Sequence, residues 1–297
     1  MALWKISEDQ HRSIFGQLCN VLEPRLAVYF GSASRELWAL TQALRQQLRA
    51  EHEAALALCL KMGMRSCKVL REAKEIDCRH KNLSGADLAT LGKLGSVLHK
   101  LEWLILIDAP IHTGVQRLVE RLGPGALPAV THFALASMSV GDAGATALAA
   151  ALGRGALPRL RILILCDAAI GDAVLVALAP ALRRLPALEG LDLERNPFGD
   201  EGIAALVAPP QPPAVAPMAG APPLPAGALA PPTTALPKLK RLHLSSTQVA
   251  DAGCAALAAA FNSGALPPLD LLGMGGIPAS VAAVDAVYER RENMRPW

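Results

Sequence analysis

The stretch Leu160-Arg161-Ile162-Leu163-Ile164-Leu165 has the pattern L-x-x-L-x-L, which recurs as Leu188-Glu189-Gly190-Leu191-Asp192-Leu193 and as Leu239-Lys240-Arg241-Leu242-His243-Leu244. After each copy come a turn, an aspartate and a run rich in Ala and Leu. Because side chains alternate along a β-strand, the pattern places its leucines on one face of a short strand. Ala and Leu favour helices, so the run after the aspartate predicts a helix. The chain therefore repeats one strand–helix unit.

The second apolar residue of each motif measures the length of the unit. These residues are Ile76, Leu104, Phe133, Leu163, Leu191, Leu242 and Leu272, and the successive steps are 28, 29, 30, 28, 51 and 30 residues. Self-similarity at a fixed period is typical of a solenoid, since one unit cannot bury its apolar face without its neighbours. We therefore predict an α/β solenoid of about seven units.

An aspartate stands before the helical run in four of the units, at Asp142, Asp172, Asp200 and Asp251. A carboxylate at this position can accept hydrogen bonds from the first free amides of a helix and suits the positive end of its dipole. We expect each aspartate to cap the helix that it begins. Recurrence in several units argues against a catalytic pair, because catalysis needs carboxylates in unlike environments at one place.

The unit resembles the leucine-rich repeat, and its length and Ala-rich helix resemble the ribonuclease-inhibitor-like subclass. The resemblance covers roughly residues 70–285, which is most of the chain. It implies a right-handed β-α horseshoe and a non-enzymatic protein that binds another protein. Asn196 matches the asparagine that the family usually places after the strand; the other units have Ala109, Met138, Ala168 and Thr247 there. These departures predict divergent, loosely specified turns.

The units divide the chain into parts. We expect the solenoid to span residues 69–285, with a C-terminal tail at 286–297 and a helical N-terminal module at 1–68. The 51-residue step is explained by residues 209–237, in which eleven of 29 residues are Pro and none is charged. Such a segment is expected to be disordered or polyproline-like. Its clusters of prolines fit an SH3 or WW groove, or the segment is a tolerated surface insertion.

The N-terminal module has apolar residues at helical spacing, namely Ile14, Phe15, Leu18 and Leu22. They predict a helix within residues 6–26, ended by Glu23-Pro24-Arg25, and Ser34 is expected to cap a second, long helix that ends near Gly63. Two interpretations of this module remain open. In the first, the module is a cap that covers the exposed core of the first unit, as terminal repeats need.

The alternative comes from a resemblance of the same segment to an F-box, carried by Ile14-Phe15, Leu18, the step Leu22–Arg25 and the helix after Ser34. That family implies docking on the Skp adaptor of a cullin ubiquitin ligase, which would make the protein a substrate receptor. The usual opening Leu-Pro is replaced here by Ile6-Ser7. The adaptor hypothesis predicts an exposed apolar surface formed by the residues Ile14, Phe15, Leu18 and Leu22.

In leucine-rich repeats the residues between the leucines of the strand form the concave face. The middle units place apolar residues there, and the first and later units place charged ones, which is the pattern expected of a protein-interaction site. Trp103 is the natural anchor, because Trp dominates interface hot spots. The predicted partner-binding residues are Trp103, Ile105, Ile107, His132, Ile162, Ile164, Asp192, Glu194, Arg241 and His243. The alternative is that another part of the chain covers this patch.

Composition narrows the functional classes. A net charge of +3, from 29 basic and 26 acidic residues, does not favour nucleic acid. No long apolar run predicts a membrane span, and the first ten residues do not resemble a secretory signal. Six scattered cysteines suit the reducing cytoplasm or nucleus. We expect no metal and no cofactor, since Cys59, Cys67, Cys78 and His80 lack the tight spacing of zinc sites and no nucleotide-binding or hydrolase motif occurs.

Overall fold

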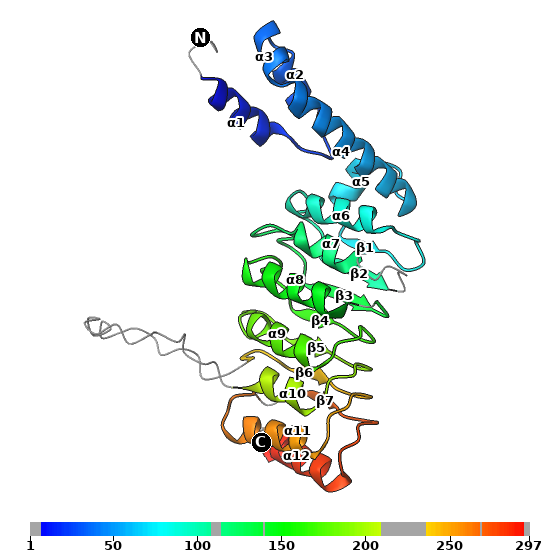
Figure 1. Ribbon diagram of the computed structural model, residues 1–297, viewed down its shortest axis with the longest axis vertical. Helices are drawn as coiled ribbons and strands as arrows, with labels where there is room; N and C mark the ends of the chain where they lie inside the picture. The colour runs from blue at the N-terminus through cyan, green and yellow to red at the C-terminus, as the bar shows by residue number, and fades with distance from the viewer. Residues whose placement is uncertain (1–6, 108–113, 139, 209–235, 268, 294–297) are drawn as a thin grey trace, which may run out of the picture.

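The computed structural model describes residues 7–107, 114–138, 140–208, 236–267 and 269–293. In these residues seven strands form one sheet, in which every neighbouring pair is parallel and the strand order follows the chain. Figure 1 shows the strands stacked from the N-terminal module to the C-terminal end. The strands are β1 (Glu75–Asp77), β2 (Trp103–Ile107), β3 (His132–Ala136), β4 (Ile162–Ile164), β5 (Gly190–Asp192), β6 (Arg241–His243) and β7 (Leu271–Gly273).

The strand register is the one that the sequence period predicts. Ile76 pairs with Leu104, Leu104 with Phe133, and each later reference residue with the next, through to Leu272. Leu191 pairs with Leu242 even though 51 residues separate them. The insertion therefore leaves the register unchanged. Residues 209–235 lie outside the described residues, so the expected character of the Pro-rich segment stays a prediction.

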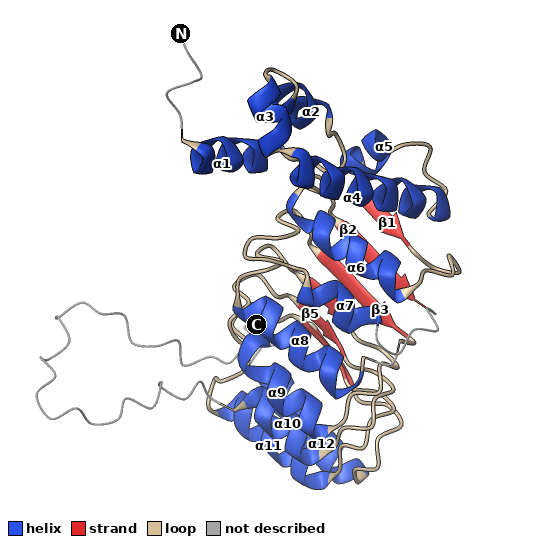
Figure 2. Ribbon diagram, turned by 45° about the horizontal axis from the view of Figure 1, so that its top comes forward, coloured by secondary structure: helices blue, strands red, loops and turns tan. Residues whose placement is uncertain are grey.

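Helices form a second layer on one side of the sheet, which Figures 1 and 2 show as a parallel stack. Each helix contacts the next along the chain. The leucines of the strands and the inner faces of the helices share one continuous core. The helices are α6 (Gly85–Lys93), α7 (Gly114–Glu120), α8 (Gly141–Gly153), α9 (Asp172–Leu182), α10 (Asp200–Val207), α11 (Asp251–Asn262) and α12 (Val281–Asn293), with a 3-10 turn at Leu94–Ser96.

We expected each recurring aspartate to cap its own helix, but three of the four, Asp172, Asp200 and Asp251, accept hydrogen bonds at the start of the helix in the following unit. Asp172 Oδ1 accepts from the amides of Gly199 (2.8 Å) and Gly202 (2.7 Å), at the start of α10. Asp200 Oδ1 accepts in the same way from the amides of Ala250 (2.7 Å) and Gly253 (2.8 Å). The helices stack side by side, so the first turn of the next helix lies within reach of the carboxylate. The aspartates therefore join units.

Asp251 continues this arrangement by accepting from the Ser280 amide at 2.6 Å, just before α12. The predicted tail at 286–297 is helical as far as Asn293, so the boundary at 286 was placed too early. Val287 of α12 is completely buried, and the Tyr288 hydroxyl donates to the carbonyl of Leu272 at 3.2 Å. This helix covers the last strand of the sheet.

Five helices precede β1: α1 (Glu8–Leu18), α2 (Arg25–Gly31), α3 (Arg35–Leu40), α4 (Gln42–Lys61) and α5 (Cys67–Glu72). The first predicted helix ends at Leu18, earlier than expected. Ser34 caps α3 as predicted, by accepting from the Leu37 amide. The expected long helix is interrupted at Thr41, whose hydroxyl donates to the Leu37 carbonyl at 2.6 Å. Such back-bonding of a hydroxyl bends helices.

Helix α4 connects the N-terminal helices to the repeats. Leu58 and Cys59 belong to the same core as Ile76 of β1. The Lys61 ammonium lies 2.6 Å from the carboxylate of Asp87 in α6. α4 therefore packs on the helix of the first unit, and Figure 2 shows it at that end of the helix stack.

Candidate functional site

The concave face, meaning the surface of the sheet opposite the helix layer, contains a shallow depression of about 360 Å³. It crosses five adjacent strands, β2 to β6. Its lining residues are Trp103, His132, Ile162, Ile164, Gly190, Leu191, Asp192, Arg241 and His243. Seven of the ten predicted partner-binding residues therefore lie together. Ile105 and Ile107 are half-buried on β2 and Glu194 follows β5, all outside the lining of the depression.

An aromatic stack forms one end of the depression. The rings of Trp103 and His132 lie with centroids 3.6 Å apart and planes at 5°. Trp103 and His132 are direct neighbours in the register of β2 and β3, so the sheet itself brings the rings together. Trp103 remains 42% exposed, which shows that none of the N-terminal helices covers it. The stack fixes a large apolar surface with little freedom left to lose on binding.

The surroundings of His132 favour its neutral form over its charged form. Burial lowers the pKa of His132 below its ordinary value, and the positive charges of Arg161 and Arg241 lower it further. Its Nδ1 lies 2.9 Å from the hydroxyl oxygen of Thr131. A neutral imidazole stacks on the indole without adding a charge to the apolar end of the depression.

Gly190 forms the floor of the depression between Ile162 and Arg241. A Cβ placed on Gly190 would lie 3.5 Å from the nearest side-chain atom of Ile162 and 3.8 Å from Arg241 Nε. These are ordinary contact distances, so a side chain could be accommodated there. Gly190 stands between two leucines of its strand motif and therefore belongs to the concave face, but it is not among the predicted binding residues. The sequence feature that could have identified Gly190 as a site residue is a glycine at a position where other strands have Trp, His and Ile.

The other end of the depression is charged. Arg241 has no ion pair in the part of the chain that the structure describes, and no ion pair joins Asp192 or Glu194 to Arg241 or His243 there. Asp192 Oδ1 instead accepts from the Glu194 amide at 3.0 Å. The cross-strand charges of β5 and β6 are therefore not neutralised by one another.

The four residues proposed for adaptor binding do not form one exposed surface. Phe15 is 0% exposed, in a small core with Ala27 and Leu48. Leu22 is 6% exposed and belongs to the core of the repeats. Ile14 and Leu18 are half-buried. The prediction of an exposed apolar face that includes Phe15 and Leu22 is therefore wrong, because Phe15 of α1 packs into the small N-terminal core and Leu22, after α1, packs into the core of the repeats.

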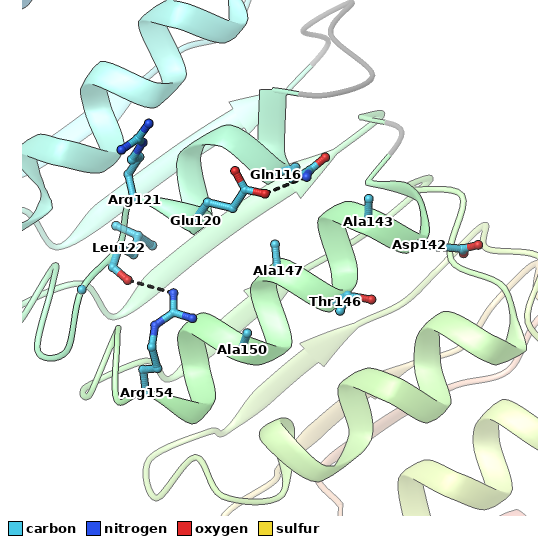
Figure 3. Close-up of a pocket in the computed structure, with 11 residues that line it drawn as sticks. Gln116, Glu120, Arg121, Leu122, Asp142, Ala143, Thr146, Ala147, Ala150 and Arg154 are labelled. Carbon is cyan, nitrogen blue, oxygen red and sulfur yellow. Dashed lines mark hydrogen bonds between the residues drawn. The ribbon is translucent and has the colours of Figure 1, made fainter.

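A larger hollow of about 710 Å³ lies on the opposite, helical face between α7 and α8 (Figure 3). Helix α8 contributes the small side chains of Ala143, Ala147 and Ala150 to its lining, together with the polar side chains of Asp142 and Thr146. Gln116 donates to Glu120 at 2.6 Å, and the guanidinium of Arg154 donates to the Leu122 carbonyl, the two interactions drawn in Figure 3. The hollow offers no large apolar anchor, so we take the concave depression as the candidate site.

No cluster of three potential metal ligands occurs among the described residues. Cys59 and Cys67 lie with their sulfur atoms 3.9 Å apart, and both are buried. Burial raises the pKa of the Cys59 thiol to about 12 and that of the Cys78 thiol to about 12. Cys78, directly after β1, is a buried core residue. No helix in the described part of the chain has the length and apolar character needed to cross a membrane.

Comparison with known proteins adds a family match. Residues 186–207 and 235–258 match the family described as Leucine Rich repeat. No curated protein matches the sequence significantly.

Three solved structures are similar to the chain, all at low sequence identity. The tropomodulin C-terminal domain of Caenorhabditis elegans is 17% identical over 54% of this chain and 81% of that chain, with a TM-score of 0.39. Leiomodin-1 actin-binding site 2 is 15% identical over 62% and 92%, with a TM-score of 0.40. An internalin of Listeria monocytogenes is 14% identical over 67% and 54%, with a TM-score of 0.32. The two matched segments and the seven-stranded parallel sheet together support the fold of an α/β leucine-rich-repeat solenoid.

Proposed function

We propose that this chain is a non-enzymatic interaction module that binds a protein partner on its concave face. The observation that supports this most strongly is the half-exposed Trp103, stacked on His132 at the end of a depression lined by Ile162 and Ile164. Rigid aromatic side chains in a partly desolvated pocket are the usual anchors of protein interfaces. Exposed apolar surface with a charged border is expected of an interaction site.

The repeat architecture supports the same proposal. A solenoid presents side chains from successive strands at a regular spacing. A partner on the concave face can therefore contact five units at once, through β2 to β6. Unit lengths of 28 to 30 residues, each with a full helix, fit the ribonuclease-inhibitor-like subclass. We propose the cytoplasm or nucleus as the location, on the ground of the six cysteines, which are unpaired.

The test is affinity purification from a cell extract with quantitative comparison of variants. The site variant is Trp103→Asp/Ile164→Asp, which places charge into the apolar part of the depression. The matched control is Ala143→Asp/Thr146→Asp, which adds the same charge on the helical face. Circular dichroism must first show equal helix content and thermal stability. We expect a partner that the site variant loses and the control retains; retention of every partner by the site variant would refute the proposal.

The adaptor alternative is tested in the same experiment. Because Phe15 is buried, substituting it would disturb the fold, so the variant is Ile14→Asp/Leu18→Asp, at positions that are half-buried. The adaptor hypothesis expects Skp and cullin components to be captured by the wild type and lost only from this variant. Absence of those components from the wild-type sample excludes a ligase receptor under these conditions and leaves the N-terminal helices as a cap.

A further inference from the structure

We propose that the depression recognises a partner segment in which a carboxylate stands next to a large apolar side chain. The carboxylate pairs with Arg241, and the apolar side chain lies over Gly190 against Ile162. This inference rests on the proposed function of the concave face and names the chemistry of its partner. Each of its parts comes from a feature of β4, β5 and β6.

The first feature is an excess of positive charge at the beginning of these strands. The guanidinium of Arg161 and the ammonium of Lys240 both pair with Glu189, at 2.8 and 3.3 Å. Hydrogen bonding from Arg161 holds the pKa of the Glu189 carboxyl below its usual range. Arg161 and Lys240 thus share one carboxylate, and Arg241 is the third cation of this edge. Arg241 is the cation left without a partner in the described residues.

The second feature is the position of Arg241 beside the apolar part of the depression. Arg241 Nε would lie 3.8 Å from a Cβ on Gly190, so the guanidinium borders the space above the glycine. Arg presents a planar donor fork that matches a carboxylate. A partner carboxylate bound there would be only partly exposed to water, which strengthens the pair relative to an exposed one. A carboxylate is therefore the group that complements this end of the depression.

The third feature is the space above Gly190 itself. In the strand register Gly190 lies between Ile162 and Arg241. Gly190 is buried and bears no side chain, whereas Trp103 and Leu271, at the equivalent position of β2 and β7, are both more than one-third exposed. A large apolar side chain of the partner would fill this gap in the row and cover Ile162. The burial of apolar surface on both sides would favour binding.

The fourth feature limits where the partner carries its charge. Asp192 lines the depression and Glu194 follows it, towards the ends of the strands. Their negative charges lie on the opposite side of Gly190 from the Arg161–Glu189–Lys240 cluster. A second carboxylate placed against Asp192 would be repelled, which works against uniformly acidic segments. The depression therefore selects one acidic residue in a fixed position beside an apolar residue.

The experiment is selection of a random twelve-residue peptide library, displayed on phage, against the immobilised full chain. Selected peptides are then synthesised with a fluorescent label, and their affinity is measured by anisotropy. The variants are Arg241→Glu, Gly190→Leu and Trp103→Asp. The matched control is Lys238→Glu, which makes the same charge change at an exposed residue outside the depression. All variants are compared by circular dichroism before use.

We expect the wild type to select peptides with Asp or Glu within two residues of Trp, Phe or Leu. Arg241→Glu is expected to lower the affinity for these peptides on the order of tenfold or more. In selection, this variant is expected to favour peptides with Lys or Arg in place of the acidic residue. Gly190→Leu is expected to abolish their selection, whereas Lys238→Glu is expected to retain them.

The outcomes separate this inference from the proposed function. Peptides that depend on Trp103 but carry no acid, or that bind Arg241→Glu as well as wild type, would overturn the inference and leave the concave face as the binding surface. Failure to select any peptide that depends on Trp103 or Gly190 would overturn both.

Discussion

Asn196 provides a test of how the repeats are held together. It is 1% exposed and lies after β5. Its Oδ1 accepts from the amides of Ala168 and Ile170, each at 3.0 Å. Its Nδ2 donates to the carbonyls of Leu165 (2.7 Å), Leu193 (2.9 Å) and Glu194 (3.1 Å). One side chain thus satisfies backbone groups of two consecutive units.

Asn196→Ala removes all five hydrogen bonds and leaves two buried amides without an acceptor. A hydrogen bond contributes about 1 kcal/mol net, and an unsatisfied buried group costs about 1 to 3 kcal/mol. Allowing for water that enters the space left by the amide, we expect the free energy of unfolding to fall by about 4 kcal/mol. The measurement is urea unfolding followed by circular dichroism.

The matched control is Thr247→Val in the next unit, where the hydroxyl makes one bond, to the Leu244 carbonyl at 2.8 Å. Its loss should cost about 1 kcal/mol. Amide hydrogen exchange localises the effect, because the amides of Ala168 and Ile170 should lose protection in Asn196→Ala and keep it in the control. Equal destabilisation by the two variants, or unchanged protection of those amides, would refute this reasoning.

Three further predictions concern other parts of the chain. Asp200→Ala should lower the unfolding free energy by about 1 to 2 kcal/mol, since Ala250 and Gly253 lose their acceptor, with faster amide exchange at the start of α11 and not of α10. The pKa of His132 is lowered, so its contribution to stability is complete above about pH 6.5 and is lost as the pH falls. The free energy of unfolding of His132→Phe, measured with urea at several pH values, should lack this part of the pH dependence. Deleting residues 211–233 restores a 28-residue step between Leu191 and Leu242. The deletion should leave the circular dichroism spectrum unchanged and raise the free energy of unfolding by roughly 1 kcal/mol. A loss of helix signal would contradict the interpretation of this segment as an insertion that leaves the repeats unchanged.

Part of this protein could be read from the sequence because the relevant physics is local. The alternation of L-x-x-L-x-L decides which strand residues are buried, so the register that pairs Leu163 with Leu191 followed directly. The same alternation put Trp103 and Ile162 on the open side of the sheet. The prediction of a solenoid followed from recurrence of the unit, which needs no knowledge of any contact.

Other features depend on distances between units, which no local rule provides. Asp172 looks like the cap of its own helix in the sequence, but the nearest free amides belong to the next helix, 27 and 30 residues later. Phe15 has the spacing of an exposed helical stripe, but it is buried in a core that it shares with Ala27 of α2 and Leu48 of α4.

The candidate site shows the same division most clearly. The spacing of the leucines is enough to place Arg241, Gly190 and Ile162 in one row of the concave face. The sharing of Glu189 by Arg161 and Lys240, which leaves Arg241 without an ion pair among the described residues, depends on how the stacked units bring these side chains together. The reason is that ion pairing between strands is a competition among side chains brought together by stacking, and its outcome is set by their geometry and not by their order along the chain.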